Sequence, residues 1–138
     1  MSHFEIFGLY FVLNLILLLV LFTGVIRIRL SGVASLGDGD HPPLIRAIRA
    51  HGNFVENAPF VFIGMMSLMQ LGTSSLMLHV VGGTFTLSRI LHARGMYQDA
   101  PVPNARRIGT ILTLLTYIIL IAYIGFLIFA SRGSYGIS

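Results

Sequence analysis

The 138-residue sequence contains no cysteine. This absence excludes disulfide bonds, a thiolate metal site and a thiol nucleophile that belongs to the protein. Any thiol chemistry must therefore come from a bound molecule. The Gly- and Asp-rich segment 37–40 has too few carboxylates for a calcium-binding loop, so we expect no metal.

Lysine is also absent, and all nine basic residues are arginine. A guanidinium group suits carboxylate partners better than an ammonium group does, which favours an anionic ligand. A GC-rich genome that replaces lysine by arginine would give the same bias, and composition does not separate the two explanations. The arginines form no run with interleaved aromatic residues, so the sequence indicates no nucleic-acid partner.

Charged residues are scarce: they make up 10% of the sequence, whereas 55% of it is hydrophobic. Soluble domains carry about 25% charged residues. The composition therefore predicts an integral membrane protein, with a single domain over residues 1–138. The apolar segment 4–28 is long enough to cross a bilayer, which takes about 20 residues. It does not resemble a signal peptide, because the positive charges of Arg27 and Arg29 follow the apolar run.

Four membrane-spanning helices are expected, at about residues 4–28, 44–71, 76–96 and 105–130, which predicts an all-α four-helix bundle. Asn14 lies in the middle of the first helix and is expected to hydrogen-bond to a neighbouring helix. A serine in segment 72–75 is expected to cap the third helix. The connector before the fourth helix contains Pro101 and Pro103. The fourth helix has one polar stripe, formed by Arg106, Thr110, Thr113 and Tyr117.

The arginines are unevenly distributed between the two ends of these helices. The connectors after the first and third helices, with the helix ends beside them, hold eight of the nine arginines, and the connector after the second helix holds none. Because cytoplasmic loops are the positive ones, both termini are expected outside the cytoplasm. Arg132, near the C-terminus, is a minor exception.

The second helix carries an unusual polar stripe. Offsets of four and seven residues bring Arg49, Asn53 and Glu56 to within roughly 40° of one another around the helix. Arg46 and Phe60 extend this stripe by a turn at each end. Ionisable groups in an apolar helix normally face a bundle interior or a water-filled cavity, so the stripe indicates a site.

Arginines from all four helices are expected to gather at the cytoplasmic end: Arg27, Arg46, Arg49, Arg89, Arg106 and Arg107. Glu56 is expected to neutralise Arg89 on the third helix. The other guanidinium groups must be hydrated or meet an anion. A small peptide with two carboxylates and an amine would fit, with the arginines on the carboxylates and Glu56 on the amine. Arginines that only set the topology, together with one buried ion pair, would give the same pattern.

Arg49, Asn53 and Glu56, followed by Pro59, resemble the signature of the MAPEG family, the membrane-associated proteins in eicosanoid and glutathione metabolism. Segments 23–29 and 89–92 resemble parts of the first and third helices in the prostaglandin E synthase branch of that family. Other segments look most like the bacterial inner-membrane members: 37–39, His92 with Gly95, and 106–109. The resemblance covers nearly the whole chain.

This resemblance implies a homotrimer of four-helix protomers, with glutathione bound between adjacent protomers near the cytoplasmic face. The positions that match glutathione-binding or site-organising residues are Arg27, Arg49, Asn53, Glu56, Arg89 and His92. In catalytic members an arginine at the start of the fourth helix holds the glutathione thiolate. Arg106 is the first choice for this role and Arg107 the second, and Thr110 would add a hydroxyl. The thiolate then attacks a lipophilic electrophile from the bilayer, as in a glutathione transferase, or a hydroperoxide, as in a peroxidase.

Two positions depart from the family pattern. Met96 stands where the catalytic branch often has a tyrosine, and Ile45 stands where the prostaglandin branch has a glutamate. Both changes argue against that branch's isomerase reaction and leave glutathione binding unaffected. A non-catalytic lipid-binding or scaffold member of the family is the alternative. A small multidrug exporter fits less well, because such proteins centre on a carboxylate in the first helix, where this chain has Asn14.

Overall fold

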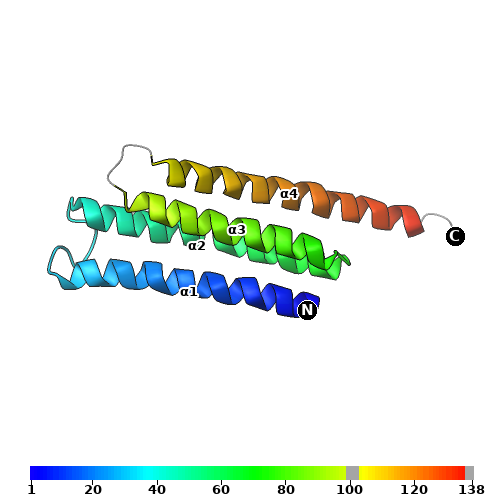
Figure 1. Cartoon of the computed structure of the whole chain (residues 1–138), viewed down its shortest axis with the longest axis horizontal. Coiled ribbons are helices and arrows are strands. Elements are labelled where there is room, and N and C mark those ends of the chain that lie inside the picture. Colours follow the sequence, from blue (N-terminus) through cyan, green and yellow to red (C-terminus); the bar gives the residue numbers. More distant parts are fainter. Residues whose placement is uncertain (99–102, 136–138) are drawn as a thin grey trace.

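The computed structural model describes residues 1–98 and 103–135, which form four α-helices and no strand (Figure 1). The helices are α1 (His3–Leu30), α2 (Pro42–Gln70), α3 (Ser75–Met96) and α4 (Asn104–Tyr135). The predicted all-α architecture is confirmed. The predicted boundaries agree with these within two residues, except that α4 continues beyond the predicted end. Pro101, which was expected in the connector before the fourth helix, lies outside the described residues.

The starts of the first three helices leave few backbone N–H groups without a partner. The Ser2 hydroxyl accepts from the Glu5 backbone N–H at 3.2 Å, while the Glu5 carboxylate accepts from the Ser2 N–H at 2.6 Å. This reciprocal pair is a capping box. Helix α2 begins with two prolines, which have no N–H to satisfy. The predicted serine cap of α3 is confirmed, since the Ser74 hydroxyl accepts from the Met77 N–H at 3.3 Å.

The helices are arranged with α2 and α3 in the middle and α1 and α4 on opposite sides of that pair (Figure 1). Helix α1 contacts α2 and α3, helix α4 contacts α3 and α2, and α1 does not contact α4. The end of α1, the start of α2, the end of α3 and the start of α4 all lie at one end of the bundle. The arginine-rich helix ends are therefore together, as their distribution in the sequence predicts.

The core lies between α2 and α3 and includes Phe54, Met65, Leu78 and Phe85, which are all buried. The outer sides of α1 and α4 expose many large apolar side chains, as lipid-facing surfaces do. Among the described residues, two helices are long and apolar enough to cross a membrane, His3–Leu30 and Asn104–Ser131. Four such helices were expected; α2 and α3 carry more polar residues and fall below this criterion.

Polar side chains join α1 to α3 within the bundle. The Asn14 side-chain amide donates to the Thr86 hydroxyl at 2.8 Å, which confirms the predicted bond between helices. Nearer the start of α1, the Tyr10 hydroxyl and the Nδ1 atom of His79 are 3.0 Å apart. These two contacts hold α1 on α3, and the Asn14–Thr86 pair does so without burying a charge.

Candidate functional site

A cleft lies between α2, the end of α3 and the start of α4, at the arginine-rich end of the bundle. Its volume is about 590 Å³, and small-molecule sites typically measure roughly 300–1,000 Å³. The residues that line it are Ile45, Ile48, Arg49, Gly52, Asn53, Glu56, His92, Met96 and Arg106. The cleft therefore combines two guanidinium groups, one carboxylate and several apolar side chains.

The polar stripe of α2 forms one wall of this cleft. Arg49, Asn53 and Glu56 all line it, as expected for side chains that follow one another at helical spacing. Arg49 and Glu56 are exposed, and Asn53 is half-buried. No hydrogen bond or ion pair joins Glu56 to another described residue within the chain, so its carboxylate faces the cleft unpaired.

Two glycines allow α4 to approach α3 closely enough for Arg106 to enter the same cleft. A Cβ atom on Gly95 would collide with the backbone and Cβ of Arg106. A Cβ atom on Gly109 would collide with the backbone of Ser88 and His92. Small residues permit such backbone contacts between membrane helices. The sequence thus places Arg106 beside His92 through the absence of two side chains.

Arg89 does not line the cleft but contacts Asn53, which does, and only 3% of the Arg89 surface is exposed. Its guanidinium group donates to the side-chain oxygen of Asn53, to the Asn53 carbonyl at 3.3 Å, to the Thr113 hydroxyl and to the Ser88 hydroxyl at 3.2 Å. It also lies 5.4 Å from the centre of the Phe85 ring. The charge is therefore solvated by neutral oxygens inside the protein.

The expected ion pair between Glu56 and Arg89 is wrong. The partners of Arg89 are neutral, and Glu56 stays exposed on the cleft. The physical reason is that burying a carboxylate beside the guanidinium would add the desolvation of a second charge. Uncharged oxygens on α2, α3 and α4 accept from Arg89 without the cost of desolvating a second charge.

A second, smaller hollow of about 120 Å³ adjoins this network on the α4 side. It is lined by Asn53, Asn57, Arg89, Thr110, Thr113, Leu114 and Tyr117. The Tyr117 hydroxyl donates to the side-chain oxygen of Asn57 at 3.1 Å. Thr113 and Tyr117 were predicted on the polar stripe of the fourth helix without a role, and Ser88 and Asn57 were not predicted to take part. The stripe itself was the signal for the first two.

The sequence model of the MAPEG family matches residues 7–126. The chain belongs to the MAPEG family. "Inner membrane protein YecN" of Escherichia coli (strain K12) is 33% identical over 90 residues, which cover 65% of this chain and 69% of that protein. The protein of the same name from Escherichia coli O6:H1 gives the same values. No solved structure matches the chain. Family membership, with the two long apolar helices, establishes a membrane protein of the MAPEG family.

Of the predicted MAPEG site residues, five line the cleft of a single chain: Arg49, Asn53, Glu56, His92 and Arg106. Arg89 lies behind Asn53, and Thr110 lines the smaller hollow, where its hydroxyl donates to the Arg106 carbonyl at 3.0 Å. Arg27 and Arg107 are exposed and line neither space. Of the two arginines considered for the thiolate, the structure therefore places Arg106 in the cleft.

The two positions that depart from the MAPEG pattern also line the cleft, where Ile45 and Met96 present apolar groups. Tyr97 does not line it. The Tyr97 hydroxyl instead lies against Gly24 of α1. Within one chain, a tyrosine from the end of α3 is therefore directed away from the cleft.

Proposed function

We propose that this MAPEG protein binds glutathione in the cleft between α2, α3 and α4. The observation that supports this best is the Glu56 carboxylate, which has no partner among the described residues and lines the same cleft as Arg49 and Arg106. Glutathione has two carboxylates for the guanidinium groups, an amine for Glu56, and the thiol that the chain itself lacks. The cleft is large enough for such a peptide.

Arg106 is the residue that we assign to the thiolate, with Arg107 as the second choice. A free thiol has a pKa of about 8.5, and an adjacent guanidinium lowers it, so that more thiolate is present at neutral pH. The reaction that follows is a glutathione transfer. The thiolate sulfur forms a bond to an electrophilic carbon of a lipophilic substrate, the leaving group departs with its electron pair, and the thiol proton goes to solvent.

A peroxidase reaction is the second chemistry of the same site. Two glutathione molecules are oxidised to the disulfide while a lipid hydroperoxide is reduced to an alcohol and water. Both reactions need only the thiolate that Arg106 stabilises, and neither requires a metal. The substrate reaches the site through the bilayer, because the protein is embedded in it.

The site is proposed to be completed in a homotrimer. Arg27 lies on α1, which does not contact α4 or contribute to the cleft within one chain. An adjacent protomer can bring its Arg27 to this cleft, as the family resemblance implies. The proposed location is the bacterial inner membrane, by similarity to YecN, with both termini outside and the glutathione site on the cytoplasmic side.

A non-catalytic lipid-binding or scaffold role is the second candidate. It is favoured by Met96 in the cleft and by Tyr97 facing α1, which leave no tyrosine from the end of α3 to assist the thiolate. Conjugation of chlorodinitrobenzene by the parent protein and by Arg106→Ala separates the two functions. Conjugation by the parent that is lost in Arg106→Ala, while glutathione binding is retained, supports the transferase. No conjugation by the parent protein supports the scaffold.

Glutathione binding itself is tested by calorimetric titration of the purified protein in detergent. Gly52 lines the cleft, and a Cβ atom there meets no other atom within 4 Å. Gly52→Leu should therefore keep the fold and weaken binding by about tenfold or more, because the new side chain occupies the cleft. Gly8→Leu, at an equally open position on α1, is the matched control and should bind like the parent. Absence of saturable binding by a folded parent trimer would overturn the proposal.

A further inference from the structure

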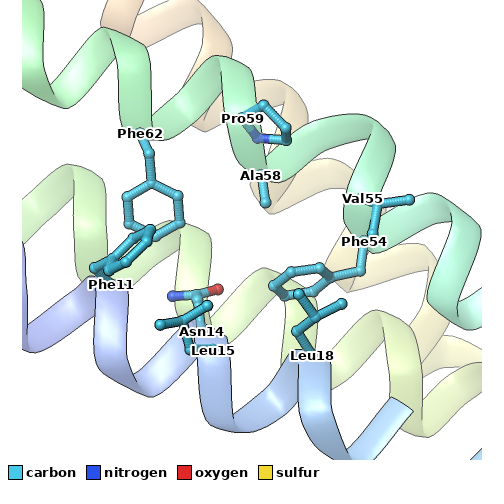
Figure 2. Close-up of a pocket in the computed structure, with 9 residues that line it drawn as sticks. All are labelled: Phe11, Asn14, Leu15, Leu18, Phe54, Val55, Ala58, Pro59 and Phe62. Atoms are coloured by element: carbon cyan, nitrogen blue, oxygen red, sulfur yellow. The ribbon is translucent and has the colours of Figure 1, made fainter. Parts of the chain in front are cut away.

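A separate pocket lies between α1 and α2, on the side of α2 that faces α1 (Figure 2). Its volume is about 300 Å³, at the lower end of the range for small-molecule sites. The side chains that define it are Phe11, Asn14, Leu18, Phe54, Ala58 and Phe62. Phe54, Ala58 and Phe62 are buried, whereas Phe11 is 40% exposed, so the pocket has a buried wall and an exposed rim.

Asn14 is the one strongly polar side chain of this otherwise apolar pocket. It is only 2% exposed, and its side-chain oxygen has no hydrogen-bond partner among the described residues. A buried acceptor without a partner is unfavourable, most of all at a depth where lipid supplies no donor.

The neighbours of Asn14 determine which way its amide points. Its nitrogen donates to the Tyr10 carbonyl at 2.8 Å and to the Thr86 hydroxyl oxygen at 2.8 Å. The Thr86 hydroxyl uses its own proton on the Gly82 carbonyl at 2.7 Å, so it can only accept from Asn14. Both neighbours are thus acceptors, and a rotated amide would place oxygen against oxygen. The unpaired oxygen must point the other way, and Figure 2 shows it directed toward the side of the pocket where Phe54 lies.

The opposite wall belongs to α2, whose regular hydrogen bonding is interrupted at a proline. Pro59 lies within α2 and has no N–H, so it cannot donate to the carbonyl of Val55 one turn earlier. Val55 and Pro59 both line the pocket. The pocket is therefore lined by apolar groups and one amide, and none of its lining side chains is charged.

We propose that this α1–α2 pocket binds an uncharged lipophilic alcohol, whose chain lies among the phenyl rings and whose hydroxyl donates to the Asn14 oxygen. A charged headgroup does not match, because neither Asn14 nor the rings can neutralise it. A purely apolar chain leaves the acceptor unpaired. The inference does not depend on glutathione binding, because the pocket shares no lining residue with the cleft.

The test uses two photoreactive probes on the purified protein in nanodiscs. One is undecanol with a mid-chain diazirine, and the other is its methyl ether, which keeps the oxygen but cannot donate a hydrogen bond. Labelled residues are then mapped by mass spectrometry. The alcohol should label the facing segments of α1 and α2 about threefold to tenfold more than the ether does. Equal labelling by both probes would contradict the role of Asn14, and labelling elsewhere only would contradict the site.

Three variants test whether the Asn14 oxygen and the pocket account for this labelling. Asn14→Leu should abolish the preference for the alcohol, because it removes the acceptor. Ala58→Leu should reduce labelling by both probes, because it fills the pocket while Asn14 stays in place. Thr73→Val is the matched control. The Thr73 hydroxyl is also buried and has no partner in the part of the chain that the structure describes, but it lies outside the pocket, so its removal should not change labelling. If Asn14→Leu does not fold, the proposal is still tested by the ratio of labelling by the two probes in the parent and by the loss of labelling in Ala58→Leu. A preference for the alcohol that persists in a folded Asn14→Leu protein would overturn the proposal.

Discussion

The guanidinium group of Arg89 on α3 donates to both the side-chain oxygen and the backbone carbonyl of Asn53 on α2. This contact connects a buried positive charge to a residue that lines the cleft. Asn53 therefore holds the α2 wall of the cleft in place, while Arg49 and Glu56 on the same stripe remain exposed to a ligand.

Asn53→Ala should destabilise the protein, because it leaves the buried Arg89 charge with fewer acceptors. Hydrogen bonds to charged groups are worth about 1.5–3 kcal/mol, so we expect a loss of that size in the free energy of unfolding. Asn57→Ala is the matched control, since the Asn57 side chain accepts from the Tyr117 hydroxyl and donates to the Asn53 carbonyl, and neither partner is a charged group. Its loss should therefore cost less than the loss of Asn53. Unfolding of both variants in detergent measures the difference, and equal losses would contradict the role given to Asn53.

Glu56→Gln should affect binding and leave stability unchanged. Glu56 is exposed on the cleft, so the free energy of unfolding should stay within about 0.5 kcal/mol of the parent value. Glutathione affinity should fall roughly tenfold, because the amine loses a charged partner. Calorimetry and unfolding on the same preparations measure both quantities. A destabilisation as large as that of Asn53→Ala would instead mean that Glu56 pairs with Arg89 after all.

Gly109→Ala should separate α4 from α3. A Cβ atom there collides with the backbone of Ser88 and His92, and such overpacking typically costs about 1–3 kcal/mol. The shift should also move Arg106 relative to the cleft and slow conjugation. Gly125→Ala on the same helix is the control, because a Cβ atom at Gly125 meets nothing within 4 Å. Indistinguishable stability of the two alanine variants would show that α3 and α4 do not depend on this close approach.

The helices, their order and the polar stripe of α2 could be predicted because they follow from local patterns. Apolar runs of bilayer length predict helices, and the spacing of Arg49, Asn53 and Glu56 places them on one side of α2. The bond from Asn14 to a neighbouring helix was predictable because an amide inside a membrane needs a partner.

The partners of Arg89 could not be predicted in the same way. Charge alone suggested Glu56, but the structure uses neutral oxygens from Ser88, Asn53 and Thr113, whose positions depend on how three helices pack together. The choice between Arg106 and Arg107 likewise depends on the contact at Gly95, which periodicity does not reveal. The intramembrane charges and the stripe are recognisable in the sequence, whereas the packing of the helices determines which of these groups are in contact.

The most direct test of the proposed function is a titration of the purified protein with glutathione, followed by the ultraviolet absorbance of the thiolate at neutral pH. The parent protein should show saturable thiolate formation. Arg106→Ala should still bind glutathione but form less thiolate and conjugate chlorodinitrobenzene roughly 100-fold more slowly, because the stabilising guanidinium is gone. Arg107→Ala should behave like the parent, since Arg107 does not line the cleft. Full thiolate formation in Arg106→Ala, or none in a folded parent protein that binds glutathione, would contradict the account.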